Sequence, residues 1–253
     1  LPESTLSASI KTFIQNALAS VPEARFGFIR HDREPLNGER RCFVAVSREA
    51  DSRLYSFNLS SVDGVFTLDL PALLRGDSRY DSALTDEPLY IVCTNGKRDA
   101  ACARYGLPLY NALRDLRPEQ VWQTIHIGGH RFAGTMVVLP QGLYYGRVAP
   151  EDAPVLIDAQ ERGDLLLNKL RGRSIYPAPV QAAEQALRER LGLSAIAAVR
   201  RLRSEAAGEQ RWQVMLEANG QAHTLTVEAS KSAFSVQTDT GGEAKPVMLH
   251  QVV

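Results

Sequence analysis

The sequence predicts an α/β protein that carries an additional α+β region at its C-terminal end. Residues 87–93 form a short, continuous apolar run that is typical of a buried strand. A helical pattern at 100–116 follows, and strand patterns lie between 121 and 148. Strands that alternate with a helix of this length favour an α/β fold. Because the composition shifts farther along the chain, we predict two units, residues 1–163 and residues 164–253.

The composition is that of an ordinary globular protein. Of 253 residues, 44% are hydrophobic and 23% are charged, and Lys plus Arg equals Asp plus Glu at 29 each. This balance does not favour nucleic acid or a membrane surface as a partner. The sequence has no apolar run of the ~18 residues that a membrane helix needs and no signal-peptide pattern, so we expect a cytoplasmic protein. Three cysteines are too few for a disulfide framework, and reduced thiols remain available to a metal.

The first third of the chain predicts one helix and three strands. Apolar residues recur at helical spacing over residues 6–20, with Ser7 or Ser9 as the N-cap. A turn is expected at 35–38, where Pro, Asn and Gly cluster. The β-prone stretches around and after this turn are residues 24–32, 40–48 and 53–60.

The middle of the chain predicts the elements that carry the cysteines and histidines. The strand at 87–93 ends at Cys93, and Asp99 is a good N-cap for the helix whose first turn contains Cys102. The elements that follow are a strand at 121–128, a hairpin that turns at 140–142 and a closing helix at about 151–162. Strand, helix, strand, hairpin and helix is the order of elements in the thioredoxin fold, so we expect a thioredoxin-like fold.

The C-terminal region predicts two helices and a set of antiparallel strands. Residues 164–174 and 179–192 read as helices, and the second is expected to stop at Gly192. Asn219–Gly220 is the strongest short hairpin signal in the chain. The strands expected around this turn and the later Gly241–Gly242 turn are residues 211–230, 232–239 and 247–253.

Two cysteines and two histidines make up the candidate metal ligands of the chain. Cys93 and Cys102 offer thiolates, and His126 and His130 offer imidazoles. This donor set suits tetrahedral zinc or an iron–sulfur cluster with histidine ligands. A zinc-protease helix is not favoured, because two glycines lie between the histidines and the position of the protease glutamate is Ile127.

Two long motifs, CTNGKRDAACARYGLPLYNAL at 93–113 and VWQTIHIGGHRFAGTMVVLPQGLYYGRV at 121–148, carry a resemblance to a known family. They resemble the sucrase/ferredoxin-like family, thioredoxin-fold ferredoxins whose [2Fe–2S] cluster is held by two cysteines and two histidines. The resemblance implies that Cys93, Cys102, His126 and His130 are the cluster ligands. Relatives usually carry an upstream strand that ends in a Gly-Pro-Trp-Gly-like turn. This sequence lacks that turn, so we expect that it is a fragment of a longer protein.

The resemblance leads us to expect an electron carrier rather than an enzyme that transforms a substrate. Cys93 and Cys102 would bind one iron, and His126 and His130 the other. Neutral imidazoles leave a cluster less negative, so we expect a potential above the roughly −400 mV of plant-type ferredoxins, with proton-coupled electron transfer. The partner would be a redox protein or a small electron donor or acceptor.

Two other hypotheses use the same residues. One is a structural zinc site in an interaction module, and the other is a thiol oxidoreductase, which the lack of a Cys-x-x-Cys motif weakens. The helix N-terminus at Asp99 is expected to favour the thiolate of Cys102. Arg131 and Arg147 are expected to lend positive charge near the site, and Cys42 is expected to be a core thiol.

Overall fold

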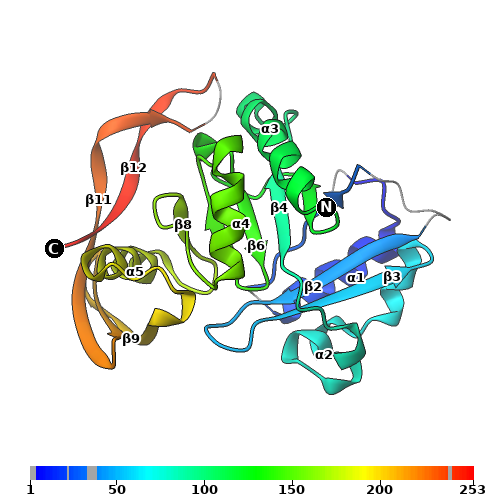
Figure 1. The fold of residues 1–253 in the computed structure, drawn as a ribbon, viewed down its shortest axis with the longest axis horizontal. Helices are drawn as coiled ribbons and strands as arrows, with labels where there is room; N and C mark the ends of the chain where they lie inside the picture. Colours follow the sequence, from blue (N-terminus) through cyan, green and yellow to red (C-terminus); the bar gives the residue numbers. More distant parts are fainter. Residues whose placement is uncertain (1–3, 22, 33–38, 239–240) are drawn as a thin grey trace.

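The computed structural model describes residues 4–21, 23–32, 39–238 and 241–253, and it has a mixed α/β architecture (Figure 1). The predicted turn at 35–38 lies outside these residues. A six-stranded sheet with the order β1-β5-β4-β6-β7-β8 forms the centre. Its strands are β1 (Ile29–Arg30), β4 (Leu89–Cys93), β5 (Val121–Thr124), β6 (Met136–Leu139), β7 (Leu143–Tyr145) and β8 (Leu170–Arg173).

The central sheet is covered on both faces. β4 runs parallel to β5 and antiparallel to β6, and all five of its residues are buried. Tyr90 and Val92 face a core formed with α3 (Ala100–Leu116) and α4 (Ala153–Glu161), which lie across the sheet in Figure 1. Leu89 and Ile91 point to the other face. The predicted strand, helix, strand, hairpin and helix of this region are confirmed.

The second face of the sheet packs against the N-terminal part of the chain. A two-stranded sheet of β2 (Arg40–Val46) and β3 (Arg53–Leu59) contributes Leu54 to this contact. The helices of this part are α1 (Ala8–Ser20) and α2 (Leu70–Arg75). Ser7 caps α1 as predicted, accepting a hydrogen bond from the N–H of Ile10. The strand expected at 24–32 is shorter than predicted, because only the two residues of β1 pair with β5.

The helix predicted at 164–174 is wrong. The segment ends in β8, which pairs antiparallel with β7, so that Tyr144 lies opposite Gly172. The φ of Gly172 is 139°, a value that no right-handed helix contains. The leucines of this segment have good helix propensity, but pairing with the edge of the sheet outweighs it. The boundary after residue 163 stays a prediction.

The C-terminal part is one helix against a four-stranded antiparallel sheet with the order β12-β11-β10-β9. α5 (Ala178–Leu191) ends at Gly192, which has a left-handed φ of 68°, as predicted. The Asn219–Gly220 hairpin is also confirmed. The strands are β9 (Val199–Gly208), β10 (Arg211–Ala218), β11 (Gln221–Gln237) and β12 (Ala244–Val252). The strand expected at 232–239 is the continuation of β11, and β9 was not predicted.

A long arm leaves this sheet. β10 pairs with β11 only as far as Glu228, whereas β12 pairs with β11 from Val227 to Gln237. The far half of β11 and its partner β12 therefore form a two-stranded arm, which we call the C-terminal arm. Figure 1 shows it rising past α5 toward the end of α3.

Candidate metal centre

Two short connections place the cysteines. Cys93 is the last residue of β4, and its N–H donates to the carbonyl oxygen of Thr135 at 3.0 Å. Asp99 caps α3 as predicted, accepting from the N–H of Ala101 at 2.9 Å, and this cap places Cys102 in the first turn. Both cysteine side chains are buried, at 1% exposure each.

Gly106 allows α3 to lie against the end of β4. A Cβ atom at Gly106 would lie 2.1 Å from the carbonyl oxygen of Cys93 and 3.5 Å from the Cα of Thr94. These neighbours are backbone atoms and cannot rotate away. The absence of a side chain at Gly106 therefore sets the distance between the helix of Cys102 and the strand of Cys93. Sequence reasoning missed this residue, although a glycine inside a helix, where it costs ~1 kcal/mol, was a signal.

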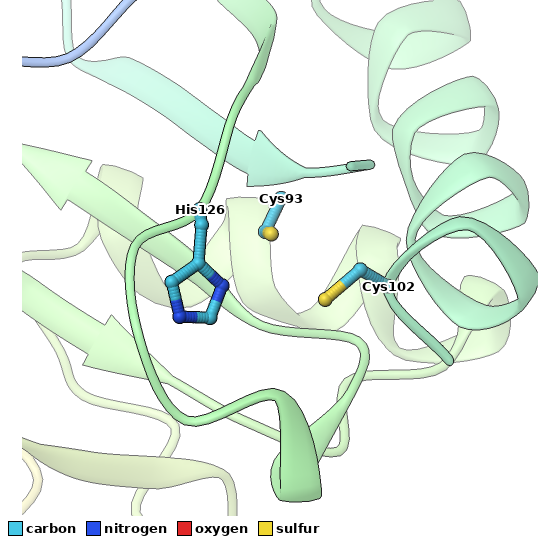
Figure 2. A group of neighbouring side chains, drawn as sticks. All are labelled: Cys93, Cys102 and His126. Carbon is cyan, nitrogen blue, oxygen red and sulfur yellow. The ribbon is translucent and has the colours of Figure 1, made fainter. Parts of the chain in front are cut away.

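The loop after β5 brings the first histidine to the cysteines. β5 ends at Thr124, earlier than predicted, so His126 lies in the loop. The Sγ atoms of Cys93 and Cys102 and a ring nitrogen of His126 all lie within 4.8 Å of one another. Figure 2 shows these three side chains pointing toward a common centre from a strand, a helix and a loop. Two sulfurs and one imidazole nitrogen fit zinc or the iron of a cluster.

His130 lies beside this group. It begins a short 3-10 turn (His130–Phe132), and its ring centroid is 5.1 Å from that of His126, with 41° between the ring planes. Gly128 and Gly129 between the histidines have φ values of 85° and 71°. Both values lie in the left-handed region that favours glycine, so the segment between the histidines is not a right-handed helix. The structure thus brings three of the four predicted ligands into one group and places the fourth next to it.

The protonation expected for Cys102 is wrong for the metal-free protein. Burial, followed by the neighbouring Cys93 and Asp99, raises the pKa of Cys102 to about 12. The helix N-terminus favours a thiolate, but desolvation and a second thiol close by outweigh it. A bound cation would offset both effects, because it supplies the positive charge that the pair lacks.

Three arginines surround Phe132 near the histidine loop. Their guanidinium carbons lie 4.6 Å (Arg131), 5.3 Å (Arg147) and 4.8 Å (Arg171) from the ring centroid. Arg131 and Arg147 were expected to lend charge here, whereas Arg171 was not singled out. It comes from β8, the strand that sequence reasoning assigned to a helix. Cys42 is half-buried in β2, away from the site, and burial raises its pKa.

The architecture and this group of side chains define the class: a mixed α/β protein with a buried Cys and His site that could hold a metal. A family model described as Sucrase/ferredoxin-like matches residues 2–172, which is most of the chain, so the protein belongs to the sucrase/ferredoxin-like family. The predicted family is confirmed.

Curated relatives match a shorter stretch. The chain is similar to Altered inheritance of mitochondria protein 32 from Meyerozyma guilliermondii, with 32% identity over 100 residues, and from Eremothecium gossypii, with 29% identity over 99 residues. The Saccharomyces cerevisiae protein of that name is 32% identical over 96 residues. Each match spans about a third of this chain and about a third of the relative (35% of each for the first). The predicted cytoplasmic location stays a prediction. Among the described residues, no helix is both long and apolar enough to cross a membrane.

Proposed function

We propose that this protein transfers single electrons through a [2Fe–2S] cluster held by Cys93, Cys102, His126 and His130. The proposal rests above all on the convergence of both Sγ atoms and a ring nitrogen of His126 within 4.8 Å, with the His130 ring centroid 5.1 Å from that of His126. Membership of the sucrase/ferredoxin-like family agrees with it. When bound, the cluster supplies a one-electron redox centre.

The order of strands supports a thioredoxin-like fold for the domain around the site. β4, α3 and β5 form a parallel strand–helix–strand unit, and β6, β7 and α4 form a hairpin and a helix. In the sheet, these strands lie in the order β5-β4-β6-β7, with the hairpin antiparallel to β4. The cysteines then lie at the end of the first strand and the beginning of the first helix.

The side chains give the site two unlike sides. The two cysteines are fully buried, whereas His126 and His130 are half-buried. The histidine side is thus the side through which electrons and protons would pass. Two neutral imidazoles in place of thiolates make the centre less negative, and a potential above about −400 mV is expected.

A structural zinc site is the second candidate function. Three donors within 4.8 Å of one another also suit a single tetrahedral ion, with His130 as the fourth ligand. The protein would then be an interaction module whose metal stabilises the loop after β5.

Metal and sulfide analysis distinguishes the two functions. Anaerobically purified protein is assayed for iron, acid-labile sulfide and zinc, and its EPR spectrum is recorded after reduction. The proposal expects two irons and two sulfides per chain, and an average g-value lowered toward that of Rieske-type centres. Stoichiometric zinc without sulfide, in protein that was never exposed to oxygen, would refute the electron-transfer function.

A further inference from the structure

A pocket of about 550 Å³ opens beside His130. Three of its four walls are Arg104 and Tyr105 of α3, the turn at His130 and Arg131, and the segment from Arg147 to Pro150. Its volume lies within the ~300–1,000 Å³ of small-molecule sites. The pocket is therefore large enough for an organic ligand next to a candidate metal ligand.

The charges of this pocket are mainly positive. Arg104, Arg131 and Arg147 line it, and none of them makes an ion pair with a carboxylate in the part of the chain that the structure describes. Arg171 does not line the pocket, but it lies near two of these arginines, because all three guanidinium groups contact the ring of Phe132.

Nearby acids do not neutralise these arginines. Asp99 lines the pocket, but it is buried and accepts the N–H of Ala101 as the cap of α3. Asp152, three residues after Ala149 in the wall, is paired with Lys169 at 2.7 Å. The carboxylates are thus engaged with other partners, and the arginines remain available to a negatively charged ligand.

The C-terminal arm forms the remaining wall. Gln237, the last residue of β11, and Thr238 line the pocket together with the arginines. The side chain of Gln237 donates to the carbonyl oxygen of Gly242 at 2.7 Å, which links the two strands at the end of the arm. The C-terminal region, for which the sequence suggested no role, thus helps to enclose this space.

We propose that this pocket binds a small organic anion that carries phosphate or carboxylate groups, held by Arg104, Arg131 and Arg147 and covered by the C-terminal arm. A planar guanidinium group can donate two parallel hydrogen bonds to two oxygens of a carboxylate or of a phosphate. The exposed ring of Tyr105, with the guanidinium carbon of Arg104 5.4 Å from its centroid, offers a surface for an unsaturated part of the ligand. A concave site with walls from separate elements favours a small molecule over the flat face of a protein.

The proposal is tested by calorimetric titration of the purified full chain with pyrophosphate and, separately, with citrate. Binding of either probe to the wild type is expected. Arg104→Gln and Arg147→Gln should each weaken it at least tenfold, the loss expected for a hydrogen bond to a charged group. Arg190→Gln is the matched control. Arg190 is exposed in the last turn of α5 and away from the pocket, so its loss should change affinity less than twofold.

The possible outcomes separate the sources of the anion. Binding of pyrophosphate alone assigns a phosphate ligand, and binding of citrate alone assigns a carboxylate ligand. Failure of both probes at millimolar concentration would overturn the proposal, as would equal weakening by Arg190→Gln. If an acidic peptide binds through Arg104 and Arg147 when neither probe does, the proposal is wrong and the pocket is a protein-docking surface.

The arm has its own test. Gln237→Glu adds a carboxylate to the lining of the pocket and would repel an anion, so it should weaken binding of the same probe several-fold. An unchanged affinity would show that the arm does not contact the bound anion. Because binding is measured as heat, the test does not require the metal centre to transfer electrons.

Discussion

Replacing Gly106 with alanine is expected to separate the helix of Cys102 from the strand of Cys93. The new Cβ would lie 2.1 Å from the Cys93 carbonyl oxygen, where a carbon–oxygen contact of ~3.3 Å is normal. Because the neighbour is backbone, α3 has to move away from β4 by about 1 Å. The two Sγ atoms, which now lie within 4.8 Å of each other, would move apart by a similar amount.

The expected loss of stability follows from two opposing effects. Overpacking costs ~1–3 kcal/mol, and contact with a rigid carbonyl places this substitution at the upper end. Alanine recovers about 1 kcal/mol, because it is the better helix former. We expect a net loss of about 2 kcal/mol in the free energy of unfolding for Gly106→Ala, or a Tm lower by ~4–8 °C in a protein of this size.

The assay is thermal unfolding of metal-free protein, together with metal content after purification under identical conditions. Gly27→Ala is the control, because its Cβ would meet only the Oγ1 of Thr124, at an ordinary 3.7 Å. Gly106→Ala should lower both Tm and metal content, and Gly27→Ala should lower neither. If Gly106→Ala matches Gly27→Ala in both measurements, the close approach of α3 to β4 does not hold the site together.

Three further predictions concern the candidate histidine ligands and the ion-paired residues Glu184 and Asp152. If the site holds the proposed [2Fe–2S] cluster, His126→Cys and His130→Cys should each keep it but lower its potential and weaken its pH dependence in voltammetry. An unchanged pH dependence in both variants would contradict proton coupling through the histidines. Glu184 is 2% exposed and pairs with two buried arginines, so Glu184→Gln should lower the free energy of unfolding, measured in urea, by ~3–5 kcal/mol. A loss below about 1 kcal/mol would show that water solvates the arginines in the variant. Burial opposes ionisation of Asp152, but hydrogen bonds from Lys169 and a backbone N–H lower its pKa. The ionised carboxylate therefore stabilises the protein above the pKa of the unfolded state, ~3.9, and this effect is lost as the pH falls through the lower pKa of the folded state. Asp152→Asn should destabilise the protein by ~1 kcal/mol at pH 7 and by progressively less below about pH 4. An equal loss at every pH would contradict this.

Local patterns predicted the elements that depend on local physics. The apolar run ending at Cys93, the cap at Asp99 and the Asn219–Gly220 turn have causes within a few residues, and the structure contains all three. The helix prediction for 164–174 was wrong, because β8 forms by pairing with β7, which lies more than 20 residues earlier in the chain. β9 was missed because its sequence is mostly polar and exposed, as suits an edge strand.

The same distinction applies to the site. Residue type and the family resemblance predicted four candidate ligands, and three of these residues meet within 4.8 Å. They could not reveal Gly106, whose importance is its distance to Cys93, or the pocket wall at Gln237, which is more than 100 residues from His130. Contacts between distant parts of a chain depend on the packing of whole elements, and residue patterns do not contain that information.

The arginines of the pocket and the C-terminal arm lie in different parts of the chain, and this difference affects ligand specificity. Arg104, Arg131 and Arg147 all lie within the segment that the family model matches, whereas Gln237 lies beyond it. The arginines offer the attraction common to any phosphate or carboxylate. Discrimination among anions of the same charge requires contacts with the rest of the ligand, and the arm supplies lining residues that are not arginines. In the proposed site, charge would therefore select the class of ligand, and the C-terminal arm would determine which member of that class fits beside His130.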